Sequence, residues 1–284
     1  MNKTALIIEG GAFRGLYAGG VLDALMAENI YFDTVVGVSA GILCATSYVS
    51  RQPGRTRAAN LALRHDSRYV GLEALRNSGG IIDVEFGFRD PEILERFPFD
   101  RERFYASDTK VYAVATNCQT GKAEYFEHNE FDFVQAMRAS TGLPIMQPMV
   151  SFNGGQYMDG GIADSVPVDW AVKRGYEKIV VILTRPLYFQ KKPVSRAMLT
   201  LCNRRYRAYP ELIKAIATQH EQYNAARIRL ARYKREGRIF LLQPSHMMSI
   251  SRLEGDIEKL DSWMQLGEDD TRRSMPELKK YLEL

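Results

Sequence analysis

The sequence predicts an α/β protein whose mostly parallel central sheet carries helices on both faces. Strand-like runs alternate with helix-like runs along the chain, which is the pattern of α/β folds. Two glycine-containing turns, at residues 10–15 and 37–41, each follow an apolar strand-like run and precede a helix-like run. Turns of this kind lie at the carboxyl ends of strands, where open α/β sheets form their sites. We therefore expect both turns at one edge of the sheet.

Apolar spacing defines the first elements. Residues 4–9 form an apolar run typical of a buried strand, and residues 16–28 place leucine and valine at helical intervals. The β-branched residues 34–36 predict the second strand. The apolar stretch 42–49 predicts the helix behind it, and a further helix is expected at residues 55–64.

The later elements are expected from the same patterns and from turn residues. Asn153-Gly154 is a strong turn signal and predicts a hairpin over residues 150–158. Gly175 and Gly237 lie just past two expected helices, a common way for a helix to end. We expect strands at residues 110–116, 123–127, 178–184 and 239–242, and helices at residues 131–140, 168–174 and 210–235.

The segment between the helix at residues 55–64 and the strand at residue 110 is rich in glycine and proline and is expected to be irregular. We expect its aromatic side chains to be exposed, in a lid or an acyl-chain wall, or else the segment to be a capping loop packed on the sheet. The aromatic residues are Tyr69, Phe86, Phe88 and Phe97.

The turn at residues 37–41 has the G-x-S-x-G pattern of a nucleophile elbow. Ser39 lies between a strand and a helix, with Gly37 before it and Ala40 and Gly41 after it. Glycines on both sides allow close backbone approach and leave room for a substrate carbonyl. The helix N-terminus places partial positive charge where an oxyanion would form. This pattern makes Ser39 the candidate nucleophile.

The first turn, Gly10-Gly11-Ala12-Phe13-Arg14-Gly15, presents backbone N–H groups to an anion. A dinucleotide pyrophosphate is disfavoured, because Ala12 replaces the glycine that would contact it. The acid spaced for a ribose, Asp33, also lies at the start of the second strand rather than at its end. The oxyanion of an acyl-transfer intermediate fits better.

A serine nucleophile needs a general base. His65, His128 and His220 have the context of surface histidines, and His246, just after the strand at residues 239–242, is the least unfavourable histidine. The better candidate is the aspartate of Asp159-Gly160-Gly161, because it directly follows the expected hairpin and the glycines let its carboxylate turn into a cleft.

Together these blocks resemble the patatin-like phospholipase family, whose pattern is G-G-G-x-R-G, then G-x-S-x-G, then D-G-G or D-G-A. The segment from Arg138 to Pro144 also resembles the family's A-S-x-x-x-P block. Two residues depart from the pattern. Ala12 stands for the third loop glycine, which matters only if that position needs a positive φ, and Ser165 stands for an asparagine, which puts a supporting hydrogen bond in doubt.

The resemblance implies a three-layer α/β/α fold and a Ser–Asp dyad without histidine, cofactor or metal. Ser39 would attack a lipid ester and Asp159 would accept its proton, in a partly dry site that strengthens this carboxylate as a base. Backbone amides of the first turn, those of Gly11 and Ala12, would bind the oxyanion. Arg14 would brace that turn or, alternatively, hold a substrate phosphate. The implied site residues are Ser39 and Asp159 (catalytic), Gly10, Gly11, Ala12, Arg14 and Gly15 (oxyanion loop), and Gly37, Ala40, Gly41, Gly160 and Gly161 (support).

The resemblance covers about residues 4–185, so we expect a catalytic domain at 1–185 and a basic, mainly helical extension packed on it at 186–284. The basic region at residues 203–238, from Asn203 to Arg238, holds 10 Lys/Arg against 3 Asp/Glu, whereas residues 249–284 hold 6 against 9. The basic region could contact an anionic membrane surface, or pair with the acidic tail. No motif or aromatic platform favours nucleic acid.

The length of the apolar runs and the spacing of the cysteines bear on the cellular compartment of the protein. Because a strand-like run begins at residue 4, we expect no signal peptide, and no apolar run approaches the roughly 18 residues of a membrane span. The three cysteines are widely spaced and form no metal or disulfide pattern. We expect a cytoplasmic protein, in part peripheral at the inner membrane face.

The leading hypothesis is thus a serine hydrolase of lipid esters in lipid catabolism. Two alternatives stay open. One is an α/β-hydrolase triad in the chain order Ser39, Asp159 and His220 or His246. The other is a catalytically silent module that binds lipid.

Overall fold

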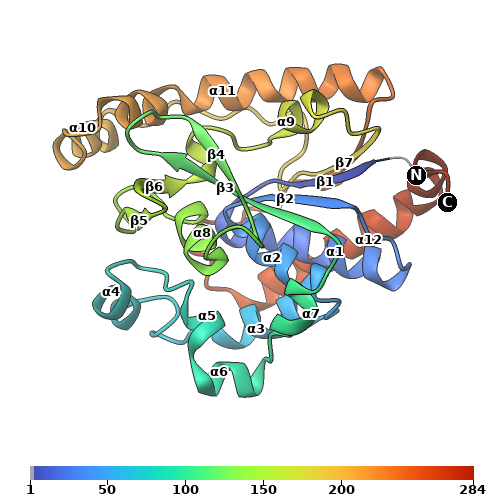
Figure 1. Ribbon diagram of the computed structural model, residues 1–284, viewed down its shortest axis with the longest axis horizontal. Helices are drawn as coiled ribbons and strands as arrows, with labels where there is room; N and C mark the ends of the chain where they lie inside the picture. Colours follow the sequence, from blue (N-terminus) through green and yellow to red (C-terminus); the bar gives the residue numbers. More distant parts are fainter. Residues whose placement is uncertain (1–2) are drawn as a thin grey trace.

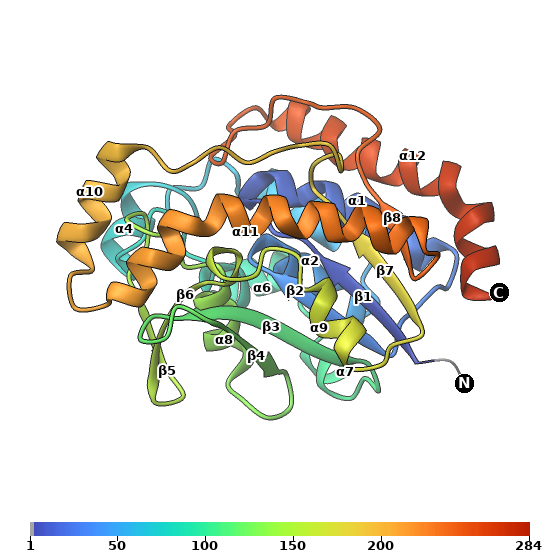
Figure 2. The same ribbon diagram turned by 90° about the horizontal axis from the view of Figure 1, so that it is seen from above.

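The computed structural model describes residues 3–284 and shows an eight-stranded sheet between two layers of helices (Figures 1 and 2). The strand order is β5-β6-β3-β2-β1-β7-β8, with β4 paired to β3. Strands β3, β2, β1, β7 and β8 are parallel, whereas β4 and β6 run antiparallel to β3. The expected α/β class is confirmed. The strands are β1 (Thr4–Ile8), β2 (Thr34–Val38), β3 (Lys110–Asn117), β4 (Ala123–Glu127), β5 (Val150–Phe152), β6 (Gly155–Asp159), β7 (Lys178–Ile182) and β8 (Ile239–Leu242).

Apolar side chains on both faces of the strands explain why helices cover the sheet twice. In β1, Leu6 and Ile8 belong to one core and Ala5 and Ile7 to the other. The first face is covered by α1 (Leu16–Ala27), α2 (Ala40–Val49), α8 (Phe133–Ser140) and α12 (Ile257–Leu282). The second is covered by α9 (Val168–Lys173) and α11 (Pro210–Arg235).

Two expected boundaries shift for identifiable reasons. Helix α8 begins at Phe133 rather than residue 131, because the carboxylate of Asp132 accepts the Gln135 N–H and caps the helix. Strand β7 ends at Ile182, because the N–H of Thr184 donates to the Glu9 carboxylate instead of continuing the ladder. The remaining elements are η1 (Ala12–Gly15), α3 (Arg55–Leu63), η2 (Gly160–Ile162) and α10 (Arg196–Arg205).

The glycine- and proline-rich segment is more ordered than the sequence predicts. It forms four short helices. Two of them begin directly after Asp90 and Asp100, whose carboxylates each accept a backbone N–H and cap the helix. Phe86 and Phe88 are buried, so the expectation of exposed aromatic residues is wrong for both. The helices are α4 (Leu72–Ser78), α5 (Phe86–Arg89), α6 (Pro91–Arg96) and α7 (Arg101–Tyr105).

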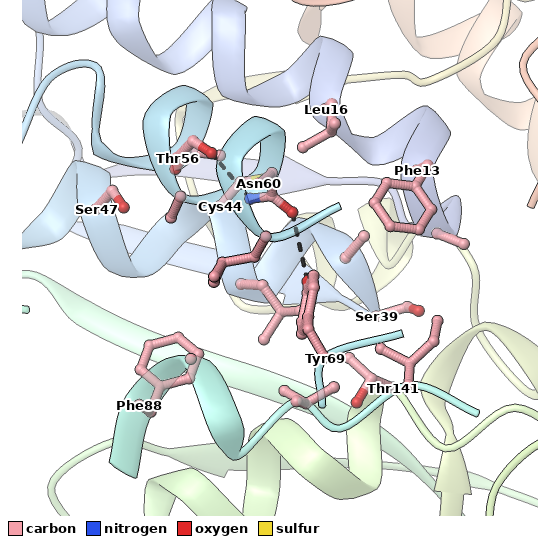
Figure 3. A pocket seen from close by; sticks show the side chains of 18 of the residues that line it. Phe13, Leu16, Ser39, Cys44, Ser47, Thr56, Asn60, Tyr69, Phe88 and Thr141 are labelled. Carbon is pink, nitrogen blue, oxygen red and sulfur yellow. Dashed lines mark hydrogen bonds between the residues drawn. The ribbon is translucent and has the colours of Figure 1, made fainter. Parts of the chain in front are cut away.

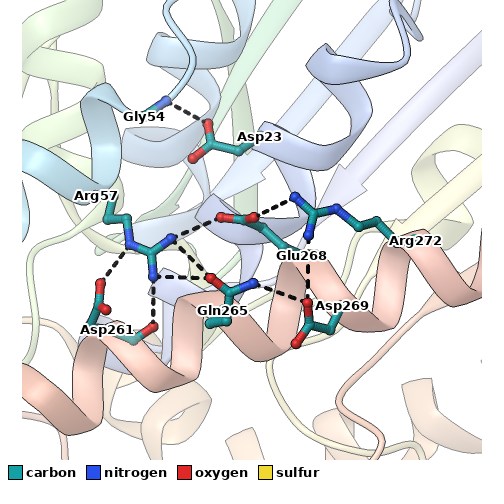
Figure 4. Close-up of polar contacts among 8 residues, drawn as sticks. All are labelled: Asp23, Gly54, Arg57, Asp261, Gln265, Glu268, Asp269 and Arg272. Carbon is teal, nitrogen blue, oxygen red and sulfur yellow. Dashed lines mark hydrogen bonds and ion pairs between the residues drawn. The ribbon is translucent and has the colours of Figure 1, made fainter.

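The C-terminal region is built into the same sheet and core. Strand β8 pairs in parallel with β7, and α12 packs along α1 with its backbone in close contact. A Cβ on Gly20 would lie 1.9 Å from the Met264 carbonyl oxygen, so only glycine allows this approach. Arg57 of α3 adds ion pairs to Asp261 and Glu268 of α12 (Figure 4). No helix within residues 3–284 combines the length and apolarity needed to span a bilayer.

Asp23 lies beside this α1–α12 contact and gives a pH-dependent prediction (Figure 4). Burial raises the pKa of Asp23 from 3.8 to about 6, although the Gly54 N–H donates to its carboxylate and Arg57 is near. The folded state therefore holds this proton more tightly than the unfolded chain, so stability falls as the pH rises from about 4 to 6.

We expect Asp23→Asn, which keeps an oxygen for the Gly54 N–H, to increase the free energy of unfolding at pH 7.5 by on the order of 2 kcal/mol. The gain should be small at pH 4, where the aspartate is already neutral. Urea unfolding at both pH values measures the difference. An equal gain at the two pH values would contradict the assignment.

Candidate active site

The elbow places Ser39 in a backbone conformation that few side chains adopt. Ser39 joins β2 to α2 with φ of +53° and ψ of −127°. The residues two positions before and after Ser39 must be glycine. A Cβ on Gly37 would lie 2.5 Å from the Ile42 Cα, and one on Gly41 would lie 2.6 Å from the Ile8 carbonyl oxygen. The Ser39 N–H donates to the Ser140 hydroxyl at 2.9 Å, so the A-S block holds the elbow from the other side.

Strand register explains why Ser39 meets Asp159. Strand β2 pairs with β3 as far as Val38 opposite Val114, and β6 pairs with β3 from Asp159 opposite Ala115. Because β4 occupies the other edge of β3 at these positions, β2 and β6 meet end to end along one edge. The Ser39 hydroxyl donates to Oδ2 of Asp159 at 2.7 Å. The two residues, 120 positions apart, are thus adjacent in space.

The turn after Asp159 fixes the second carboxylate oxygen. Oδ1 accepts the Gly161 N–H at 2.8 Å, and a Cβ on Gly160 would lie 2.1 Å from the Val114 carbonyl oxygen. The Gly161 carbonyl accepts the Ser165 hydroxyl at 2.7 Å and also the side-chain amide of Gln219 from α11. Ser165 therefore supplies a supporting hydrogen bond although it replaces the family's asparagine.

The dyad is shielded from water. Ser39 is 7% exposed and Asp159 is 5% exposed. Burial raises the pKa of Asp159, while the hydrogen bonds from Ser39 and Gly161 and the charges of Lys191 and Arg252 lower it. Burial is the largest of these effects, so the pKa of Asp159 is raised overall, and a carboxylate with a raised pKa is a stronger base than one in water.

The glycine loop packs directly against the elbow. A Cβ on Gly10 would lie 2.7 Å from the Val38 carbonyl oxygen, and one on Gly15 would lie 2.6 Å from Cβ of Ala40. Ala12 has φ of +50°, so the position does require the conformation that glycine adopts most easily. Across residues 3–284, the N–H groups of Gly11 and Ala12 have no hydrogen-bond acceptor in the protein.

Arg14 braces the neighbourhood of this loop. Its guanidinium donates to the Ile250 carbonyl at 3.2 Å, and its own carbonyl accepts the Trp263 indole N–H at 2.8 Å. Burial and, to a smaller extent, the nearby charges of Arg185 and Arg252 together lower its pKa to about 10. The loop is thus tied to the segment before α12 and to α12 itself.

Two hollows meet at Ser39. The smaller, of about 100 Å³, is mostly apolar, and its walls include Phe13, Leu16, Cys44, Tyr69 and Phe88 (Figure 3). The larger, of about 560 Å³, contains Ser39 and Asp159 together with the glycine loop. Their linings share Ala12, Ser39 and Leu143.

The larger cleft also contains residues that sequence reasoning missed. Arg185, Lys191 and Arg252 line it, although they are far from the recognised motifs. Arg185 could have been found, because it follows β7 and the carboxyl ends of parallel strands share one edge. Lys191 and Arg252 lie in loops whose course no local pattern predicts.

No histidine joins the dyad. His128 is buried beside Phe104 and Tyr105, so its expected surface position is wrong. His220 contacts the Ala217 carbonyl and His246 contacts the Ser245 hydroxyl. Within residues 3–284 no histidine hydrogen-bonds to Ser39 or Asp159, and no group of three or more potential metal ligands is gathered.

The contact between Gly15 and Ala40 gives a stability prediction. We expect Gly15→Ala to lower the free energy of unfolding by about 1–3 kcal/mol, because the new methyl group would overlap the elbow helix. Gly255→Ala is the matched control, since its Cβ would meet only the end of the Arg64 side chain at 3.7 Å. Urea unfolding of both variants compares them, and equal losses would argue against tight loop–elbow packing.

Comparison with known proteins agrees with the motifs. The family model described as patatin-like phospholipase matches residues 6–172, and a domain of unknown function (DUF6363) matches residues 209–283. The uncharacterized protein YjjU of Escherichia coli (strain K12) is 31% identical over 190 residues, which are 65% of this chain and 53% of that protein.

Two further relatives have descriptive names. The probable lipid hydrolase 463L of Invertebrate iridescent virus 6 is 26% identical over 184 residues, covering 59% of this chain and 63% of that protein. The cGAMP-activated phospholipase of Pseudomonas aeruginosa (strain BWHPSA011 / Pa011) is 26% identical over 190 residues, covering 57% and 53%. The matched part of this chain spans about half to two thirds of the length of these curated relatives.

Proposed function

Because this chain belongs to the patatin-like phospholipase family, we propose that it is a serine hydrolase of lipid carboxylic esters. The observation that carries the proposal is the 2.7 Å hydrogen bond from the Ser39 hydroxyl to Asp159 at the floor of an open cleft. A nucleophile whose proton already points at a buried carboxylate needs no imidazole between them. The Gly11 and Ala12 N–H groups, free of protein acceptors within residues 3–284, supply donors for an oxyanion.

The proposed reaction has two steps. Ser39 Oγ attacks the ester carbon while its proton passes to Asp159, and the carbonyl oxygen becomes an oxyanion held by Gly11 and Ala12. The tetrahedral intermediate expels the alcohol, which takes the proton from Asp159, and leaves an acyl group on Ser39. Asp159 then takes a proton from water, the hydroxide attacks the acyl carbon, and Ser39 leaves with that proton.

The apolar hollow is the proposed place for the acyl chain. It is lined by Phe13, Leu16, Leu43 and Phe88 and reaches Ser39, so a chain lying in it would present its carbonyl to the nucleophile (Figure 3). Burying methylene groups there contributes roughly 0.8 kcal/mol each. This assigns the expected acyl-chain wall to α5 and to Tyr69, which precedes α4.

We expect Ser39→Ala and Asp159→Asn each to reduce hydrolysis of a p-nitrophenyl acyl ester by at least about 10³-fold, because each removes one half of the dyad. A fluorophosphonate probe should label the wild type at Ser39 and neither variant. Ser151→Ala and Asp108→Asn, at exposed positions, are the matched controls.

The same assay separates the alternatives. Full activity in Ser39→Ala or Asp159→Asn would refute the dyad. Loss of activity in a folded His220→Ala or His246→Ala variant would favour a triad. A wild type that binds lipid but neither turns over nor takes the probe would be a lipid-binding module.

We further propose a catalytic domain at residues 1–185, a C-terminal extension at 186–284 and a place on the cytoplasmic face of a membrane. Within the basic region, Arg227 and Arg229 are already paired with Glu9 and Asp169. We propose that the membrane contact is made near the end of α10, where Arg204, Arg205 and Arg207 are exposed close together in the sequence. Figure 1 shows α10 projecting at the end of the molecule toward which β1 runs.

Vesicle sedimentation tests the membrane contact. Replacing Arg204, Arg205 and Arg207 with glutamine should weaken binding to phosphatidylglycerol-containing vesicles by about 10- to 100-fold, at about 1 kcal/mol per charge near the surface. Glutamine at Arg232, Lys234 and Arg235, at the other end of α11, is the matched control. Equal losses in both variants would place the contact elsewhere.

A further inference from the structure

Five cationic side chains line the larger cleft beside Ser39 and Asp159: Arg14, Arg185, Lys191, Lys192 and Arg252. All but Arg14 lie outside residues 6–172, which match the patatin-like family model. Across the described residues, 3–284, none of the five forms an ion pair with a carboxylate, and Glu9 and Asp169 pair with other arginines. In this part of the cleft the cationic side chains therefore outnumber the two carboxylates, Glu9 and Asp159.

The two carboxylates in the lining, Glu9 and Asp159, are already engaged. Glu9 accepts hydrogen bonds from the Tyr223 hydroxyl at 2.7 Å, from Arg227 at 2.8 Å and from the Thr184 N–H at 2.6 Å. Asp159 holds Ser39 and Gly161. Neither carboxylate forms a hydrogen bond or ion pair with the five lining cations within residues 3–284, so these two acids offset the positive charge only in part.

The cations also act on one another. Burial and, to a smaller extent, the charge of Arg252 together lower the pKa of Lys191 to about 8. The same charge and that of Arg185 act on Arg14. A fold that keeps like charges together around an open cleft concentrates anions there, since one-signed clefts with low-dielectric walls focus the field.

The aromatic rings in the cleft do not offer a place for a cationic headgroup. The Arg185 guanidinium lies 3.8 Å from the Phe189 ring centre. The Tyr223 ring has Arg227 at 4.6 Å and Lys191 at 5.4 Å. A quaternary ammonium is recognised by free aromatic faces or free carboxylates, and both are occupied here.

The arrangement of the two hollows indicates the orientation in which an ester substrate would bind. They share Ser39, so an ester carbon bound there would have its acyl chain on the apolar side and its alcohol part on the cationic side. Resting on the proposed hydrolase function, we propose that Arg185, Lys191 and Arg252, with Arg14, bind an anionic phosphate in the alcohol part. The preferred esters are those whose headgroup is net negative, in preference to zwitterionic choline esters.

The test compares three esters with the same oleoyl chain, below their critical micelle concentrations: lysophosphatidylglycerol, lysophosphatidylcholine and monooleoylglycerol. Oleate release should show a kcat/KM about tenfold or more higher for the phosphatidylglycerol ester than for the other two. Arg252→Gln and Lys191→Gln should each lower that preference by about tenfold, mainly through KM. Lys234→Gln, an exposed lysine on α11 outside the cleft, is the matched control and should keep the preference.

Each outcome is decisive. Equal rates on all three esters would overturn the anionic preference and leave the hydrolase function standing, whereas no release from any ester would count against the hydrolase itself. Equal rates on both phospholipids above the glycerol ester would show a phosphate site without charge selection, and would also overturn the proposal. Unchanged preference in both variants, with thermal unfolding confirming that they are folded, would place the selection outside the cluster.

A further arm separates a lipid headgroup from a free anion. In the proposal, glycerol 3-phosphate competes with lysophosphatidylglycerol, and the competition weakens in Arg252→Gln. If glycerol 3-phosphate binds but no ester preference exists, the cluster serves a free phosphate and the headgroup assignment is wrong.

Discussion

The hydrogen bond between Ser39 and Asp159 depends on two strands that end against each other on one edge of β3. Val38 faces Val114 and Asp159 faces Ala115, so consecutive positions of a single strand set the spacing of the dyad. Because the pairing of β3 is fixed on both edges, neither residue can shift without breaking a ladder of backbone hydrogen bonds. The chemistry is thus fixed by backbone register, and the side chains need little adjustment to meet.

The C-terminal region completes the site. Glu9, at the end of β1, is held by Tyr223 and Arg227 of α11, in an ion pair whose side chains are 4% and 5% exposed. Removing one partner of such a buried pair would leave an unpaired charge, at a cost of about 3–5 kcal/mol. Gln219 of the same helix contacts the turn after Asp159. One helix therefore supports the strand end that carries the glycine loop and the turn that carries the base.

The sequence predicted that Ser39 and Asp159 come together, because strand-to-turn-to-helix junctions have local signatures and parallel strands end at one edge. The sequence could not predict that β6 pairs antiparallel with β3 directly beyond the last residue of β2. More than one hundred residues separate β2 from β6, and no local pattern shows that both pair with the same edge of β3. The sequence did not predict the cationic cluster of the larger cleft for a similar reason. Lys191 is positioned by backbone hydrogen bonds to Asn224 of α11, at 2.8 and 3.1 Å, which is a long-range contact without a motif.

Ser39 and Ala12 have strained backbone conformations, which the packing around them must hold in place. Ser39 and Ala12 both have positive φ, which for residues with a Cβ costs on the order of 1 kcal/mol or more. Glycines at 10, 15, 37 and 41 let the loop, the elbow and β1 approach at distances that any side chain would prevent. The packing they permit holds both strained residues in place, so the Ser39 hydroxyl and the loop N–H groups are positioned without a substrate. Such positioning would lower a reaction barrier only if it lasts through the reaction, and the hydrogen-bonded ladders that join β1, β2 and β3 support it from below.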